Sequence, residues 1–228
     1  WIHRQVGPEF IYRKTGLRID PYFSLPKLLW LKQNQPDLLK RAHKFLAVHD
    51  LIVHFLTGRF VTEWTQASRT MLFNIAAFRW DEEICDRFEI PPALLPEAVP
   101  PGTVVGGLRR SLSRELGISA GVPVVAVGGD QQAAAVGLGV VQPGLMGVNS
   151  GTGSFVLAHS ERPVFDEQRR VICTASPVAG KWLLEGSVIT AGCVYRWFRD
   201  NFGAPTRDAD VARAGPGARG ILLIPHFA

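Results

Sequence analysis

Apolar residues recur at helical spacing along the first quarter of the chain. In residues 28–31 and 38–42 they fall so that they share one face of a helix. Pro36 followed by Asp37 is typical of the start of a helix, and Gly58 stands where a helix ends. The pattern therefore predicts successive helices between residues 23 and 57.

Beyond residue 58, extended and helical segments alternate. Residues 59–64 read as a short extended segment, and residues 81–90 as a short helix stopped by Pro91 and Pro92. The following proline-rich stretch to residue 108 is predicted to be irregular. A short helix, a turn, a buried strand "VPVVAV" and a helix rich in small residues complete this part. The alternation predicts the α/β class.

After residue 142 the pattern changes to hairpins. Residues 144–160 read as two strands joined by a Gly-Thr-Gly turn, and residues 170–187 as a second hairpin that turns near Ala179 and Gly180. An amphipathic helix with Gly203 past its end follows, and then one more buried strand is expected within residues 215–227. We therefore expect two domains, residues 1–142 and residues 143–228.

Composition and charge narrow the classes of protein. Of the 228 residues, 46% are hydrophobic and 20% charged, which is ordinary for a globular protein. The net charge of +5 is dispersed, so neither nucleic acid nor an anionic membrane is the expected partner, and no apolar stretch is long enough to predict a membrane span. Three widely separated cysteines indicate free thiols in a reducing compartment, so we expect a cytoplasmic protein.

Asp130 is the first candidate for chemistry. It follows "VPVVAVGG", so it lies at the carboxyl end of the expected strand, where α/β proteins bind ligands. A carboxylate there can accept a proton from an attacking hydroxyl. The alternative is that Asp130 only caps the helix that follows, because Asp favours that position. The two roles are compatible.

The turn Gly151-Thr152-Gly153 is the second candidate. A glycine-rich hairpin turn is common and needs no function. Glycines beside a threonine also expose N–H groups and a hydroxyl to phosphate oxygens. Since no Gly-Lys-Ser/Thr follows, the segment is not a Walker motif.

Other polar residues leave alternatives open. Tyr22 is either a packed aromatic or a hydroxyl donor to a polar ligand, and Arg69 is either a surface residue or an anchor for a carboxylate. Lys27 and Trp30 share a helical face and are expected to pack on the core. The six histidines lack zinc-site spacing, so no metal ligand is predicted among them.

Several of these segments together resemble the FGGY family of carbohydrate kinases. They are "YFSLPKLLWLKQN", "ASRTMLFNI", "GGDQQAAAVGLGVVQPG", "NSGTGSF", "TAGCVYRWFRDNFG" and "GILLIPHFA". The segments "TGLRIDPYFS" and "ASRTMLFNI" are more similar to the glycerol kinase branch. The resemblance implies an actin-like, ribonuclease-H-like two-domain kinase fold, with the substrate mainly on the first domain and ATP mainly on the second.

The resemblance also implies roles for single residues. Asp130 would accept the proton of the substrate hydroxyl, and Gln131 and Tyr22 would contact other hydroxyls. Thr152 with Gly151 would face the terminal phosphates of ATP, usually with Mg²⁺, and Gly192 would lie at the nucleotide pocket. Arg196 stands where glycerol kinases resemble one another in carrying glutamine, so its contact differs from theirs.

Three features of the family pattern do not occur in this sequence: the N-terminal Asp-Gly-Thr phosphate hairpin, the Arg-Glu pair that grips the substrate, and the C-terminal glycine-rich adenosine segment. The fold is therefore expected to be incomplete at both ends, and the 228-residue piece to be inactive alone. The oligomeric state stays open, a homo-oligomer included.

The sequence thus predicts an ATP-dependent kinase for a small polyol or sugar. Glycerol is favoured by "IDPYFS" and "ASRTMLFNI", whereas "LEGSVITAG" suits a ketose kinase such as a xylulokinase equally well, and Glu63-Trp64 departs from the glycerol pattern of Asp-Tyr. The alternatives are a non-catalytic actin-like module that binds nucleotide or sugar, and a nucleotide hydrolase.

Overall fold

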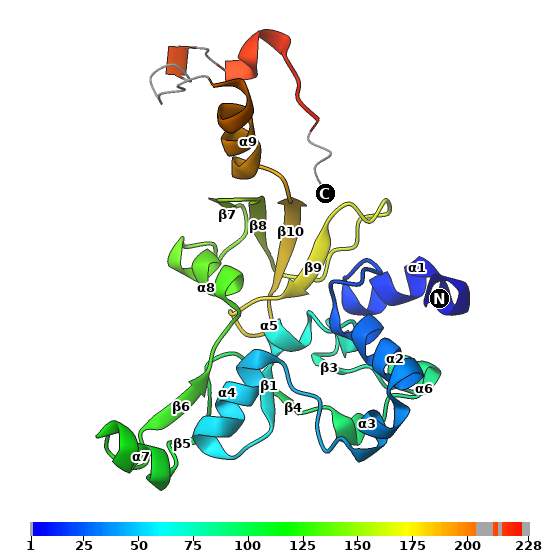
Figure 1. Ribbon diagram of the computed structural model, residues 1–228, viewed down its shortest axis with the longest axis vertical. Helices are drawn as coiled ribbons and strands as arrows, with labels where there is room; N and C mark the ends of the chain where they lie inside the picture. The colour runs from blue at the N-terminus through cyan, green and yellow to red at the C-terminus, as the bar shows by residue number, and fades with distance from the viewer. Residues whose placement is uncertain (1, 204–211, 214–215, 225–228) are drawn as a thin grey trace. The chain divides into compact units, whose positions relative to one another are not determined.

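The chain divides into two compact units in the computed structural model, which describes residues 2–203, 212–213 and 216–224. The first unit comprises Trp1–Gly147 and Leu157–Glu185, and the second comprises Val148–Val156 and Gly186–Ala228. Figure 1 shows the order of the helices and strands along the chain.

The first unit begins with four helices. They are α1 (Ile2–Thr15), α2 (Ser24–Asn34), α3 (Pro36–Arg41) and α4 (Val48–Thr57). Three of these confirm the predicted helices, with Pro36 at the first turn of α3 and Gly58 as the left-handed cap of α4 at φ 85°. The sequence pattern did not predict α1, because no apolar stripe runs along it and Gly7 and Pro8 lie within it. In the structure Gly7 interrupts the helix, at φ 71° and ψ 158°.

Short strands and helices fill the middle of this unit. They are β1 (Val61–Glu63), α5 (Trp64–Ala67), β2 (Phe73–Asn74), β3 (Arg79–Trp80), α6 (Glu82–Phe88), the 3-10 turn Pro92–Leu94 and β4 (Glu97–Val99). Strands β1 and β4 pair in parallel, and β2 and β3 pair antiparallel. The helix α6 ends at Glu89 with φ 53°, before the prolines that were expected to stop it.

The proline-rich stretch is more regular than predicted. Besides β4 it contains β5 (Thr103–Gly107), which pairs antiparallel with β6 (Pro123–Ala126). Val99 and Val105 from this stretch are buried in a cluster with Val53 and Val61. The prediction of an irregular segment was therefore wrong, because burial of these valines by distant partners decides the local structure.

The strand before Asp130 is also less buried than predicted. Helix α7 (Arg110–Leu116) lies between β5 and β6, and α8 (Asp130–Gly137) follows β6 (Figure 1). In β6 Ala126 is fully buried, but Val125 is 42% exposed. Pro123 and Val125 share a face of the strand and are both exposed, so that face lies open to solvent.

A four-stranded sheet follows in the order β7-β8-β10-β9. Its strands are β7 (Met146–Ser150), β8 (Ser154–Ser160), β9 (Ile172–Ala175) and β10 (Trp182–Val188), so both predicted hairpin segments form strands.

Helix α9 (Gly192–Phe202) ends at Gly203 as expected. A 3-10 turn spans Pro216–Gly220. Residues 221–224 form no strand and are exposed, so a buried strand is wrong there, while 225–227 lie outside the described residues.

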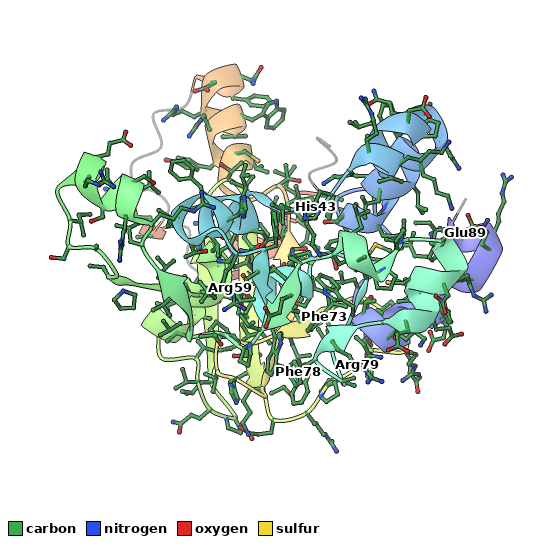
Figure 2. All side chains as sticks on the ribbon, turned by 90° about the horizontal axis from the view of Figure 1, so that it is seen from below. His43, Arg59, Phe73, Phe78, Arg79 and Glu89 are labelled. Atoms are coloured by element: carbon green, nitrogen blue, oxygen red, sulfur yellow. The ribbon has the colours of Figure 1, made fainter. Side chains whose placement is uncertain are left out.

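Besides the valine cluster described above, two further apolar clusters help to hold the first unit together. The larger one joins α1, α2 and α6, with Leu17, Leu25, Leu28, Ile84 and Phe88 among its buried members. The second contains Phe73 and Trp182, with Phe78 packed against it; Figure 2 labels the two phenylalanines. Trp64 of α5 stacks on Phe78 with ring centroids 4.4 Å apart. This packing fixes α5, which bears on the site below.

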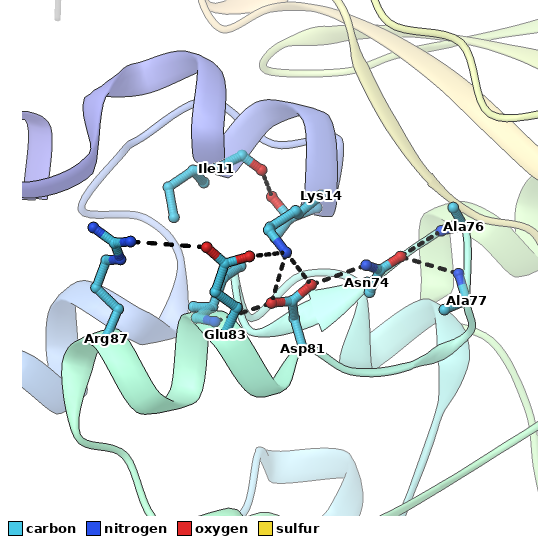
Figure 3. A network of polar contacts seen from close by, with 10 residues as sticks. Ile11, Lys14, Asn74, Ala76, Ala77, Asp81, Glu83 and Arg87 are labelled. Carbon is cyan, nitrogen blue, oxygen red and sulfur yellow. Dashed lines mark hydrogen bonds and ion pairs between the residues drawn. The ribbon is translucent and has the colours of Figure 1, made fainter.

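A polar network joins α1 to α6 (Figure 3). Asp81 caps α6 by accepting the N–H of Ile84 at 2.9 Å, and its carboxylate also accepts from Asn74 Nδ2 at 2.9 Å. Lys14 Nζ lies 3.1 Å from Asp81 Oδ2 and 2.9 Å from Glu83 Oε2. Because one carboxylate serves all three donors, the network ties two helices to the β2–β3 hairpin.

Candidate active site

Asp130 is the first residue of α8 and is exposed. Gly129 occupies the N-cap position, and Asp130 Oδ1 accepts the N–H of Gln131 at 2.7 Å. Asp130 therefore is not the N-cap residue that its alternative interpretation expected. Its carboxylate lies on the surface of the unit, where a ligand can reach it.

The two glycines before Asp130 lie close to neighbouring side chains, and neither has a left-handed backbone. A Cβ added to Gly128 would lie 3.1 Å from Pro177 Cγ. A Cβ on Gly129 would lie 2.7 Å from Gln132 Oε1 and 3.2 Å from Gln66 Nε2. The turn is therefore packed closely against neighbouring side chains, which restricts where Asp130 can stand.

Gln131 and Trp64 each present a buried donor. Gln131 Nε2 and Trp64 Nε1 have no hydrogen-bond partner within the part of the chain that the structure describes. Buried polar atoms are nearly always paired, so each orphan needs an explanation, and a ligand oxygen is one. The sequence singled out Gln131 by resemblance. It offered no signal for the Trp64 indole, because burial without a partner is visible only in three dimensions.

Tyr22 is 69% exposed, so it is not a buried packing residue. Its ring meets Phe23 edge-on, with centroids 5.4 Å apart, and the Arg69 guanidinium lies 5.9 Å from its centroid. Trp30 is 55% exposed, so the expected core packing of Trp30 is wrong. Lys27 Nζ binds the carbonyl of Tyr22 at 2.7 Å. The tyrosine ring is therefore held at the surface with its hydroxyl end accessible.

Arg69 is an anchor for a carboxylate. Its Nη1 donates to Glu185 Oε2 at 2.9 Å, and the two side chains are 24% and 4% exposed. The sequence left this role undecided, and it did not single out Glu185 because 116 residues separate the partners.

In the second unit, residues 151–153 form the predicted turn between β7 and β8. The Gly151 N–H donates to the Gly153 carbonyl at 2.7 Å, and the hydroxyls of Ser150 and Ser154 lie 2.7 Å apart across the hairpin. Gly151 and Thr152 are exposed. A Cβ on Gly151 would meet no atom within 4 Å, so the space beside this glycine is open to a ligand.

The first turn of α9 is fastened to this hairpin. The N–H groups of Gly192 and Ala191 donate to the carbonyls of Gly151 and Thr152 at 3.0 and 2.9 Å. A Cβ on Gly192 would lie 2.2 Å from the Gly151 oxygen, so only glycine fits. Arg196 is exposed and stands one turn further along α9. The structure thus brings together three of the residues that were expected to bind nucleotide: Gly151, Thr152 and Gly192.

No group of three or more His, Cys, Asp and Glu side chains suited to a metal ion occurs within residues 2–203, 212–213 and 216–224. Over the same ranges, no helix is long and apolar enough to cross a membrane.

Comparison with known proteins defines the class. The sequence profile for the N-terminal domain of the FGGY family of carbohydrate kinases matches residues 1–137. The chain therefore belongs to the FGGY family of carbohydrate kinases. It is 38% identical to glycerol kinase of Alkalilimnicola ehrlichii over 99% of this chain and 47% of that protein. It is 36% identical to glycerol kinase of Thermococcus onnurineus over 96% of this chain and 45% of that protein. The chain thus spans about half the length of the curated relatives it matches.

Solved structures of sugar kinases share the fold. Plasmodium falciparum glycerol kinase with ADP aligns at a TM-score of 0.84 and 28% identity, over 94% of this chain and 44% of that one. Ligand-bound xylulose kinase from Lactobacillus acidophilus aligns at 0.86 and 28% identity, over 93% and 44%. The predicted α/β, actin-like (ribonuclease-H-like) kinase fold is confirmed.

Proposed function

We propose that the complete protein transfers the terminal phosphoryl group of ATP to a hydroxyl of a small polyol or sugar. The proposal rests on the position of Asp130, whose carboxylate is exposed at the start of α8 in a chain that belongs to a carbohydrate kinase family. A residue that merely capped α8 would stand one position earlier, at Gly129.

In this proposal Asp130 accepts the proton of the substrate hydroxyl as the new P–O bond forms. Gln131 and Tyr22 bind further hydroxyls of the substrate. Gln131 brings a buried Nε2 without a partner among the described residues, and Tyr22 brings an exposed phenol. Because donors of this kind orient a polyol without reacting with it, they select the hydroxyl that reaches Asp130.

The nucleotide side consists of Gly151, Thr152, Gly192 and Arg196. The open space beside Gly151 and the exposed hydroxyl of Thr152 fit a phosphate group, and Arg196 adds a positive charge further along α9. ATP, when bound with Mg²⁺, supplies the phosphoryl group and an electrophilic phosphorus. The metal in such sites is held largely by phosphate oxygens and water, so a dedicated cluster of protein carboxylates is not required.

We further propose that residues 1–142 belong to the substrate-binding domain and that residues 143–228 begin the nucleotide-binding domain. The family profile, which matches residues 1–137 as an N-terminal domain, supports this boundary. Cys85, Cys173 and Cys193 are free thiols, which suits a cytoplasmic location.

Glycerol is the substrate we place first, ahead of a ketose such as xylulose. Two relatives, 38% and 36% identical to this chain, are named glycerol kinase, whereas the similar solved structures include xylulose kinases. A panel of glycerol, xylulose and related polyols and ketoses, offered to the complete protein with ATP and magnesium, distinguishes them by kcat/KM. A ketose preferred over glycerol would overturn the ranking and keep the reaction class.

Asp130→Asn in the complete protein tests the reaction itself. The amide keeps the shape and cannot accept the proton, so kcat should fall by about 10²–10⁴-fold while the affinities for substrate and ATP change little. The exposed Asp37 of α3 is the matched control, and Asp37→Asn should leave kcat unchanged. Equal turnover of Asp130→Asn and the wild type would favour a non-catalytic binding module, and ATP loss that no polyol stimulates would favour a hydrolase.

A further inference from the structure

Glu63 is a fully buried carboxylate at the N-cap of α5. Its Oε2 accepts the Thr65 N–H at 2.8 Å and its Oε1 accepts the Gln66 N–H at 2.8 Å. The hydroxyl of Thr65 also donates to Oε1 in a short hydrogen bond. Burial raises the pKa of Glu63, and the hydrogen bonds from Thr65 and Gln66 oppose that rise. Burying a carboxylate costs free energy, and capping one short helix is a small return for that cost.

The Thr65 hydroxyl connects this carboxylate to the turn before Asp130. Thr65 is 1% exposed, and its Oγ1 accepts the N–H of Gly129 at 2.9 Å. A hydroxyl has a single proton, and Thr65 donates it to Glu63. The Thr65 oxygen can therefore only accept a hydrogen bond from Gly129, through a lone pair. Glu63 thus determines the direction of both hydrogen bonds of this hydroxyl.

Packing reinforces the same contact. A Cβ on Gly128 would lie 3.5 Å from Thr65 Oγ1, and a Cβ on Gly129 would lie 3.2 Å from Gln66 Nε2. Residues 128–129 therefore lie directly against α5, which the stack of Trp64 on Phe78 fixes in turn.

We propose that Glu63 and Thr65 are a positioning pair, which holds the Gly129 amide and thereby fixes where α8 begins and where the Asp130 carboxylate stands. The catalytic consequence rests on the proposed kinase function. Neither residue touches the substrate in this account. A displacement of about 1 Å at a reacting group can cost about 10²-fold in rate, so a single hydrogen bond at this turn is enough to matter.

Amide hydrogen exchange in the complete protein tests the contact without reference to activity. Thr65→Val keeps the shape and removes the hydroxyl, so exchange at Gly129 should quicken by about 5–10-fold, the equivalent of one hydrogen bond. Thr65→Ser keeps the hydroxyl and should retain the protection. Thr57 is the matched control, because its hydroxyl also donates one hydrogen bond, here to the Val53 carbonyl, and accepts one N–H, that of Arg59. Thr57→Val should leave Gly129 unchanged.

Steady-state kinetics test the consequence. Thr65→Val should lower kcat by about 10–10²-fold with KM for ATP within about twofold, and Thr65→Ser should recover kcat to within a few-fold. Glu63→Gln, which replaces one of the two accepting oxygens by an NH₂ group and so opposes a donor to a donor, should act in the same direction as Thr65→Val.

Unchanged exchange at Gly129 in Thr65→Val would overturn the positioning pair, as would a loss of kcat that Thr65→Ser does not recover. If the wild-type protein catalysed no phosphoryl transfer, the proposed function would be overturned instead. The exchange comparison would then still test whether Thr65 holds the Gly129 amide.

Discussion

Arg69 and Glu185 form an ion pair, at 2.9 Å, that joins the residues after α5 to the middle of β10. The Glu185 side chain is 4% exposed, so its charge is almost entirely removed from water. Arg69 in turn lies over the rings of Tyr22 and Phe23, at 5.9 and 5.5 Å from their centroids. One arginine therefore connects the helix-forming N-terminal part, the segment around α5 and the four-stranded sheet.

Removing one partner of this pair should destabilise the fold. Arg69→Met leaves the Glu185 carboxylate buried without its cation, and we expect a loss of about 2–3 kcal/mol in the free energy of unfolding. The Arg69 side chain is 24% exposed, so the expected loss lies just below the range of about 3–5 kcal/mol for fully buried pairs. Urea unfolding measures the loss.

The surface pair of Lys40 and Asp37, 76% and 87% exposed, is the control, and Lys40→Met should cost less than about 1 kcal/mol. Replacing both partners by Arg69→Met with Glu185→Leu should cost less than Arg69→Met alone. A double variant as unstable as the sum of the single variants would contradict the pairing.

Asp81 should make the stability of the protein dependent on pH. Burial raises the pKa of this carboxyl, but hydrogen bonds from Asn74, the Ile84 N–H and Lys14 outweigh burial, and the pKa is lowered from 3.8. A lowered pKa in the folded state means that Asp81 contributes its stability above about pH 4 and loses it as the pH falls through the folded value.

Asp81→Asn isolates that contribution, because asparagine is also a good N-cap. We expect a cost of about 1–2 kcal/mol at pH 7 that shrinks steadily below pH 4. Denaturant unfolding of wild type and variant from pH 7 to pH 2 measures it. A difference that stays constant with pH would show that the charge of Asp81 contributes nothing.

Gly192 should not tolerate a side chain. Since a Cβ would lie 2.2 Å from the Gly151 carbonyl oxygen, Gly192→Ala must push α9 away from the hairpin turn. In the complete protein we expect ATP to bind at least about 10-fold more weakly, which corresponds to about 1.4 kcal/mol. Calorimetric titration with ATP measures the change.

Gly137 in α8 is the matched control, because a Cβ there meets no atom within 4 Å. Gly137→Ala should raise stability by up to about 1 kcal/mol and leave ATP binding unchanged. Normal ATP affinity in Gly192→Ala would contradict the proposal that this turn belongs to the nucleotide site.

The three cysteines should differ in reactivity. Burial raises the pKa of both the Cys85 and the Cys173 thiol to about 11, so at pH 8 neither supplies appreciable thiolate. Cys193 is only partly buried. In the folded 228-residue chain a thiol reagent should therefore label Cys193 first, and Cys85 and Cys173 should react only after denaturation. Equal labelling of all three without denaturant would contradict the buried positions.

Local patterns predicted much of the secondary structure because the forces behind them are local. The helical spacing of leucines, Pro36 and Gly58 were enough for α2, α3 and α4, and the turn residues were enough for the strands on either side of residues 151–153. The same reasoning failed for β4, β5 and the exposure of β6. Whether a short apolar segment pairs, and which face it buries, depends on a partner far along the chain.

The sequence by itself determined the family, the fold class and the candidate residues Asp130, Gln131 and Thr152, since these depend on the order and spacing of residue types. Only the tertiary structure decided that Gly129 and not Asp130 is the cap of α8, that Arg69 meets Glu185, and that Thr65 accepts the Gly129 amide. Those contacts join residues separated by 64 and 116 positions. Such contacts form only when distant helices and strands pack against one another, and the spacing of residues along the chain does not specify that packing.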